Sequence, residues 1–225
     1  MKLITDYAQW YDGLFDGTGV AFHRTARTRG GLAKREQFQL FERLGWPAPP
    51  HGLIAELATR TGLAAAWLFP RTAWHRELEA VVYLDELQHQ GEGKLKLPLA
   101  EALTQYPGHY GSLFIPLAHP AVSLRHVRFG RLGFWLRQQG GADWRSNRAD
   151  TETILSRALH PEPNPIPRVL WAVDFLPAPS GLLAVDFNTA PQLVTLHETG
   201  ALTLDQVRAE LDFTAATHPE WLRQF

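Results

Sequence analysis

Three oxygen-bearing side chains near the C-terminus have the types and spacing of a cation site. Asp174 lies near the end of one predicted strand, VLWAVDFL (169–176), and Asp186 lies 12 positions later in the next, LLAVDFN (182–188). Asn188 is two positions further on, so Asp186 and Asn188 point to the same face of their strand. If the strands pair about the turn PAPSG, Asp174 lies opposite that face. Buried carboxylates need a cationic partner, and two carboxylates with one amide oxygen suit Mg²⁺.

The same residues have a second interpretation. Asp186 and Asn188 of the DFN sequence could simply accept hydrogen bonds from turn amides at the end of a strand. The hairpin taken alone leaves both interpretations open.

The elements that must position this hairpin indicate an α+β chain. KREQFQLFERL (34–44) has Phe38, Phe41 and Leu44 at helical spacing with charges opposite, and Gly45 ends this predicted helix. Strands are expected at 78–84, 94–97, 112–117, 123–129 and 132–137. Helices are expected at about 53–62, from Pro98 through Leu103, and at about 151–159.

Two further segments divide the C-terminal part. HPEPNPIP (160–167) is too rich in proline for a helix or a central strand, so it separates two structural blocks. The last helix begins at a capping box formed by Thr203 and Gln206. In the N-terminal segment 11–29, turn signals at Asp12-Gly13 and Asp16-Gly17 suggest a short hairpin.

Composition excludes several kinds of chemistry. The 225 residues include 22 basic and 23 acidic side chains, so no overall charge draws the chain to nucleic acid or to a membrane. There are no cysteines, which excludes disulfides, thiolate metal sites and a cysteine nucleophile. The ten histidines show no zinc-ligand spacing. No secretory signal or membrane span is visible, and a cytoplasmic protein is expected.

The C-terminal hairpin is similar to the signature of ATP-grasp enzymes. In VDFLPAPSGLLAVDFNTAPQL, as in that signature, an acidic residue is followed about a dozen positions later by an acidic-x-Asn pattern. Asp186 stands where the family has Glu, and Pro191-Gln192 stands where it has Pro-Gly. The upstream stretch SLRHVRFGRLGFWLRQQGGADWRSN resembles ribosomal-protein glutamate ligases, and the matching residues are Arg125, Gly130, Arg137, Arg145 and Asn147.

Two more segments agree in order with this resemblance, which covers roughly residues 34–195. VVYLDELQHQGEGKLKL resembles the strand and glycine-rich loop that close over phosphates, and KREQFQLFERLGWPAPP resembles the helix and turn before the nucleotide lobe. Gly91 and Gly93 would let backbone N–H groups approach phosphate. Arg145 has a fork of donors that suits a phosphate or acyl-phosphate oxygen.

The resemblance implies a fold and an activity. The fold would be α+β and ATP-grasp-like, with two lobes of antiparallel sheet and packed helices. Residues 1–110 would hold a reduced N-terminal region and a small nucleotide-covering lobe, and residues 111–225 a lobe with the metal site. The activity would be ATP- and Mg²⁺-dependent ligation of a carboxylate to an amine through an acyl phosphate. Asp174, Asp186 and Asn188 would bind the metal, and Arg145 and Arg125 would act in catalysis.

Cofactor contacts would come from Gly91, Gly93, Lys94, Tyr83, Arg137 and Asn147. Here the chain departs from the family. Tyr83 replaces the usual phosphate-binding Lys, and Lys94, just after the loop, is a candidate substitute. No acidic residue lies between Gly111 and Leu124, where the adenine-binding hinge usually has one. The usual N-terminal substrate domain is absent or cut to about 30 residues.

Two other functions stay open. One is a non-catalytic binding protein that keeps the ATP-grasp fold. The other is a nucleic-acid-associated module that uses the basic segment FHRTARTR (22–29), with Arg24, Arg27 and Arg29. The expected partners are a nucleotide and an unidentified carboxylate or amine substrate, with a peptide or protein among the options. A homo-oligomer is also left open.

Overall fold

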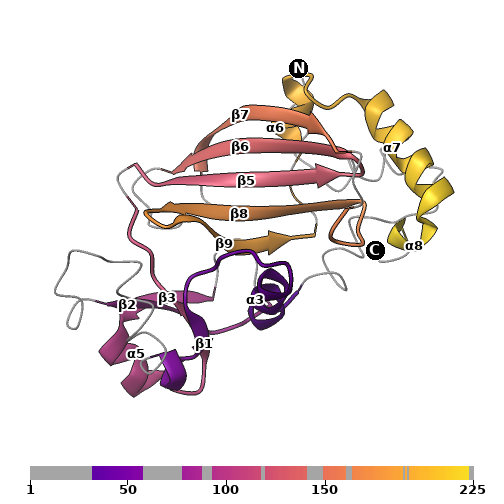
Figure 1. Ribbon diagram of the computed structural model, residues 1–225. Coiled ribbons are helices and arrows are strands. Elements are labelled where there is room, and N and C mark those ends of the chain that lie inside the picture. The colour runs from indigo at the N-terminus through magenta and orange to yellow at the C-terminus, as the bar shows by residue number, and fades with distance from the viewer. Residues whose placement is uncertain are drawn as a thin grey trace.

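The computed structural model describes residues 32–57, 78–87, 93–117, 120–140, 149–160, 164–189, 191 and 193–222. These residues form two antiparallel sheets with helices packed on them (Figure 1). The predicted α+β class, with two lobes of antiparallel sheet, is confirmed.

The smaller sheet has four strands in the order β1-β4-β2-β3. Their bounds are β1 His51–Leu53, β2 Glu79–Tyr83, β3 Lys94–Pro98 and β4 Tyr110–Leu113. Helix α5, Leu99–Gln105, begins directly after Pro98, as predicted, because proline fits the start of a helix. The chain passes to the larger sheet after β4, a few residues beyond the division expected at 110/111.

The larger sheet has five strands in the order β7-β6-β5-β8-β9. Their bounds are β5 Val122–Phe129, β6 Leu132–Gly140, β7 Ala149–Leu159, β8 Leu170–Ala178 and β9 Gly181–Asn188. The β5–β6 hairpin turns at Gly130, whose φ of 54° is easily reached only without a side chain. The predicted antiparallel pairing of the last two strands is confirmed.

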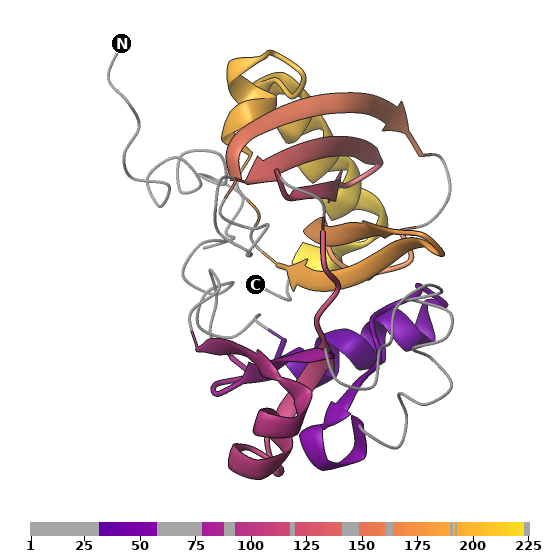
Figure 2. The same ribbon diagram turned by 90° about the vertical axis from the view of Figure 1, so that its left-hand side faces the viewer.

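Helices cover the two faces of the larger sheet differently. Helices α6 (Val194–Glu198), α7 (Leu204–Thr217) and α8 (Pro219–Leu222) pack against the larger sheet, with α6 beside β7 (Figure 1). Leu196, Val207 and Leu211 pack there on Phe129, and the predicted capping box at the start of α7 is present. Helix α3, Lys34–Arg43, lies between the larger sheet and the smaller one (Figure 2).

Helix α3 belongs to an aromatic cluster that joins the two lobes. Phe38 and Phe41 pack in one buried group with Tyr83 of the smaller sheet and with Trp171 and Phe187 of the larger sheet. This cluster fixes α3 against strand β9. The first residues of α3 therefore lie beside the strand that carries Asp186.

Two predicted elements are wrong. Residues 151–159, expected as a helix, are part of the edge strand β7, which pairs with β6. Thr151, Thr153 and Ile154 are β-branched and favour an extended chain, and β6 supplies the ladder of hydrogen bonds. The strand expected at 112–117 ends at Leu113, and residues 114–117 are irregular.

Some expectations lie partly or wholly outside the described residues. The N-terminal hairpin and the basic segment 22–29 are among them, as is the second half, 58–62, of the helix expected at 53–62. Within the described part of the chain, no helix is long and apolar enough to cross a membrane.

Candidate functional site

Three charged side chains lie in one row across the larger sheet. Arg125 of β5 is in register with Asp174 of β8, and Asp174 is in register with Asp186 of β9. Directly paired residues of antiparallel strands share a face, so the three side chains are neighbours. Arg125 donates from Nε to Asp174 Oδ1 at 2.6 Å and from Nη2 to Oδ2 at 2.9 Å. This two-pronged contact fixes the Asp174 carboxylate.

The row extends to Asn188. Its Nδ2 lies 3.5 Å from Asp186 Oδ2, and its backbone is in register with Ala172. Asp186 and Asn188 therefore lie on one face of β9, and Asp174 lies opposite Asp186 on β8. Asp174 is 2% exposed, so its carboxylate lies at a buried position.

Lys34 completes the charge balance and was not singled out from the sequence. It is the first residue of α3 and is 2% exposed. Its Nζ contacts Asp186 Oδ1, lies 3.0 Å from Gln37 Oε1 and lies 3.4 Å from the carbonyl oxygen of Val185. Burial lowers the pKa of Lys34 well below its usual value, and the nearby charge of Lys94 lowers it further.

The two carboxylates are therefore not bare, which corrects the premise drawn from the sequence. Asp174 is paired with Arg125, and Asp186 is paired with Lys34. Protein cations already offset the cost of burying these acids. An external cation is not required for the fold.

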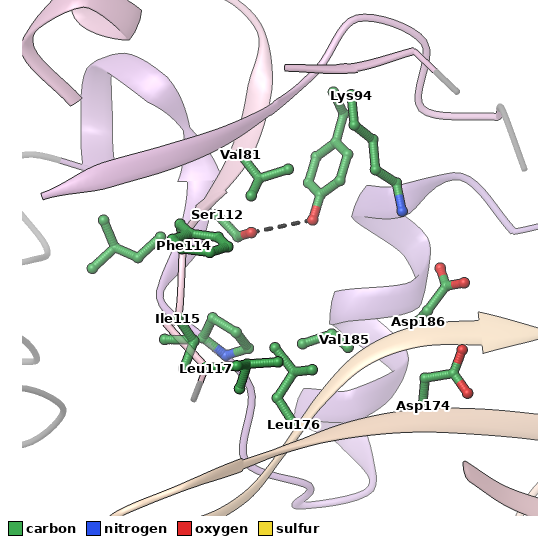
Figure 3. Close-up of a pocket in the computed structure, with 13 residues that line it drawn as sticks. Val81, Lys94, Ser112, Phe114, Ile115, Leu117, Asp174, Leu176, Val185 and Asp186 are labelled. Carbon is green, nitrogen blue, oxygen red and sulfur yellow. Dashed lines mark hydrogen bonds between the residues drawn. The ribbon is translucent and has the colours of Figure 1, made fainter. Parts of the chain in front are cut away.

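A pocket opens from this charged row into the space between the two sheets (Figure 3). Asp174, Asp186 and Lys94 lie at one end, where the Lys94 side chain points toward Asp186 in the figure. The rest of the wall is mainly apolar: Pro49, Val81, Leu113, Phe114, Ile115, Leu117, Leu176 and Val185. The pocket thus suits a ligand with a flat apolar end and an anionic end.

Tyr83 lies in the wall of this pocket where the ATP-grasp resemblance places a Lys. Its hydroxyl forms a 3.1 Å hydrogen bond with Ser112 Oγ, and burial raises the pKa of Tyr83 to about 12. The phenol therefore stays neutral. Lys34 Nζ and Lys94 Nζ lie 5.7 and 5.9 Å from the centre of its ring. Two ammonium groups from other positions thus surround the substituted residue.

The structure places the remaining predicted site residues differently. Arg137 follows Leu136, the register partner of Arg125, so its side chain lies on the opposite face of the sheet and is not brought to the row. Gly93 has a φ of 63° directly before Lys94, and its carbonyl accepts from Leu84 N at 2.8 Å. Gly91, Arg145 and Asn147 lie outside the described residues.

The donor set fits a hard divalent cation. Two carboxylates and one amide side by side offer the oxygen ligands that Mg²⁺ takes, with phosphate oxygens and waters as the others. The described residues contain no group of three or more His, Cys, Asp or Glu side chains that could hold a metal ion. Asp174, Asp186 and the amide oxygen of Asn188 are the residues that would hold Mg²⁺.

Comparisons with known proteins found similarity only among solved structures. No protein-family profile matches the sequence, and no curated protein sequence matches it. A RiPP-associated ATP-grasp ligase of Chryseobacterium gregarium, in complex with ADP and a leader and core peptide, is similar over 89% of this chain and 62% of that one, with 15% identity and a TM-score of 0.46.

Two further solved structures have comparable coverage and TM-scores. The macrocyclase MdnC of Microcystis aeruginosa, bound to the precursor peptide MdnA, matches over 86% of this chain and 64% of its own, with 13% identity and a TM-score of 0.44. The D-alanine–D-alanine ligase of Bacillus anthracis, complexed with ATP, matches over 82% and 65%, with 8% identity and a TM-score of 0.47. The chain thus spans less than two thirds of the length of each of these three proteins.

Proposed function

We propose that this chain is an ATP-grasp-type ligase that binds ATP with Mg²⁺ between its two sheets. It would use ATP to join a carboxylate to an amine through an acyl phosphate. The observation that carries the proposal is the pocket whose wall is apolar at one end and bears Asp174, Asp186 and Lys94 at the other. A purine fits the apolar end, and phosphates fit the charged end.

The apolar end has a natural place for a base. Val81 comes from β2, Ile115 and Leu117 come from the irregular segment after β4, and Leu176 comes from β8. A flat ring held between these side chains from both sheets would be shielded from water. The base would then direct the phosphates toward the carboxylate row.

The charged end of the pocket has both positive and negative side chains. Lys34 and Lys94 lie beside Tyr83 and would offset the negative charge of phosphate oxygens. Arg125 holds Asp174 through two hydrogen bonds and keeps its carboxylate oriented. Asp174, Asp186 and Asn188 would hold Mg²⁺, which would supply positive charge to offset the charge of the phosphates as a substrate carboxylate approaches.

The proposed reaction is balanced without a protein nucleophile. A substrate carboxylate oxygen forms a bond to the γ-phosphorus, and the bond from that phosphorus to the β–γ bridging oxygen breaks, which releases ADP. The amine nitrogen then bonds to the acyl carbon, inorganic phosphate leaves, and the amine loses one proton. The task of the protein is to position the groups and to stabilise charge.

A binding experiment with one variant tests the nucleotide part of this proposal. ATP with Mg²⁺ is expected to raise the melting temperature of the wild-type protein, because a ligand that binds only the folded state stabilises it. Asp186→Ala is expected to abolish this increase. The measurement is a thermal melt followed by intrinsic fluorescence, with and without ATP and Mg²⁺.

The matched control is Asp212→Ala, which removes an exposed carboxylate from α7, away from the pocket. This variant should keep the full ATP-dependent increase. An Asp186→Ala protein that responds to ATP and Mg²⁺ as the wild type does would remove the carboxylate row from the proposed function.

A further inference from the structure

The ion pairs at the site differ in how firmly each carboxylate is held. Asp174 receives two donor atoms of Arg125 in a planar fork, which is hard to displace. Asp186 receives the single ammonium group of Lys34. The same ammonium group also lies within reach of Gln37 Oε1 and the Val185 carbonyl oxygen. Lys34 therefore has other acceptors around it, and its pairing with Asp186 is the more exchangeable of the two.

A divalent cation that binds here without a nucleotide has to replace a protein cation, which is unfavourable. To use Asp186 it must displace Lys34, and Lys94 adds a second positive charge at the same end of the pocket. The displaced Lys34 is almost fully buried and would lose the carboxylate that it contacts directly, while the charge of Asp174 still acts on it. Separating a buried ion pair is costly, so Mg²⁺ by itself should bind poorly.

A nucleotide changes this balance. Its phosphates would enter at the charged end of the pocket and provide anionic oxygens near Lys34 and Lys94. Lys34 could then pair with the phosphate oxygens in place of Asp186, and Asp186 would become available to a metal.

We infer that the Lys34–Asp186 ion pair makes metal binding at Asp186 conditional on a bound nucleotide. This inference rests on the proposed function. Lys34 is in this respect a positioning residue, because it acts on the metal through Asp186. The metal and the nucleotide should therefore enter together, and the nucleotide-free protein should keep its acidic residues in ion pairs.

The test uses Mn²⁺ as the probe and measures free Mn²⁺ by electron paramagnetic resonance. Wild-type protein is titrated with Mn²⁺ alone and with Mn²⁺ plus a non-hydrolysable ATP analogue, and the Mn²⁺ that the analogue binds by itself is measured without protein and subtracted. The expected result is weak binding of Mn²⁺ alone and at least about tenfold tighter binding with the analogue. Equal Mn²⁺ affinity under the two conditions would overturn the inference without any variant.

The decisive variant is Lys34→Met, which removes the charge and keeps a similar volume. It is expected to bind Mn²⁺ without nucleotide at least about tenfold more tightly than the wild type, because Asp186 is no longer paired. A role in folding alone would not produce this gain. Lys96→Met is the control: Lys96 does not line the pocket and pairs with Glu79, so its loss should leave Mn²⁺ binding unchanged.

The outcomes separate this inference from the proposed function. If the wild type binds the analogue with Mn²⁺ but Lys34→Met gains no affinity for Mn²⁺ alone, the inference is wrong and the proposed function stands. If the wild type binds neither the analogue nor Mn²⁺ in any combination, the proposed function fails and the inference fails with it.

Discussion

At the scale of single residues, the charges of the site come from four separate elements. Asp174 and Asp186 belong to β8 and β9, whereas Arg125 comes from β5 and Lys34 from α3. Removing one partner of a buried ion pair typically costs about 3–5 kcal/mol, because the other charge stays buried without compensation. The row is thus part of the stability of the fold as well as a candidate binding site.

His126 gives a pH-dependent prediction at the same scale. Its ring stacks on Trp135 with centroids 4.6 Å apart, and it meets Trp171 edge-on at 5.5 Å. Burial, and then the charges of Arg128 and His160, lower the pKa of His126 to about 4. The unfolded chain binds a proton near the ordinary value of about 6.5, so stability is lost as the pH falls from about 6.5 toward about 4.

The expected size of this effect can be measured by comparison with His126→Phe. Between pH 7 and pH 5 the wild type should lose about 2 kcal/mol more unfolding free energy than the variant. Urea unfolding at the two pH values gives both numbers. Equal losses in the two proteins would show that His126 does not carry this acid sensitivity.

The residue scale also shows what the sequence could and could not predict at the site. The spacing of Asp174, Asp186 and Asn188 predicted their positions on paired strands, because strand alternation and a hairpin turn determine which residues share a face. The partners Arg125 and Lys34 lie 49 and 152 positions away from the acids they contact, so strand spacing could not pair them. A signal for Lys34 was present, since it falls with Gln37, Phe38 and Phe41 on the buried face of the predicted helix.

At the scale of elements, the buried amide of Gln37 helps to hold α3 against β9. Gln37 accepts from Phe187 N at 2.9 Å and from Lys34 Nζ at 3.0 Å, and it donates to the Leu32 carbonyl at 2.8 Å. Gln37→Met should lower the unfolding free energy by about 1–3 kcal/mol, because the Phe187 N–H stays buried without an acceptor.

Urea unfolding measures this loss, and Gln105→Met is the matched control. Gln105 is exposed at the end of α5, where its side-chain amide donates to Glu101 Oε1 at 3.0 Å. Its replacement should change stability by no more than about 0.5 kcal/mol. Similar effects of the two substitutions would mean that the Gln37 amide does not fasten α3 to β9.

The elements themselves were predictable where local signals agree with tertiary contacts. Helix α3 ends before Gly45, and the capping box at Thr203 starts α7, because both signals act within a few residues. Strand β7 was missed because a short mixed segment has no period that separates helix from edge strand. Its conformation depends on the hydrogen bonds that β6 offers, which are set by the sheet and not by the segment.

At the scale of the whole molecule, the two sheets share one buried aromatic cluster. Phe38 is fully buried and packs in a group that contains Tyr83 and Tyr110 of the smaller sheet and Trp171 of the larger sheet. Because this cluster spans both lobes, a loss of packing in it should destabilise both lobes. The pocket walls come from the same two lobes, so the cluster also sets the distance between them.

Phe38→Ala should therefore lower the unfolding free energy by about 3–5 kcal/mol. Far-ultraviolet circular dichroism and tryptophan fluorescence should give the same urea midpoint, because both lobes unfold together. The control Phe213→Ala removes an exposed ring that contacts Arg131, and it should cost at most about 1 kcal/mol. Two separate transitions in the wild-type protein would contradict a shared core.

The proposed function depends on what occupies the space between the sheets. The most direct measurement is a crystal structure of the protein with a non-hydrolysable ATP analogue and Mn²⁺, with the metal located by its anomalous scattering. The expected result is a base against Val81, Ile115 and Leu176, and a metal peak within about 2.3 Å of a carboxylate oxygen of both Asp174 and Asp186. A nucleotide bound elsewhere, or a metal peak that touches neither carboxylate, would contradict the account.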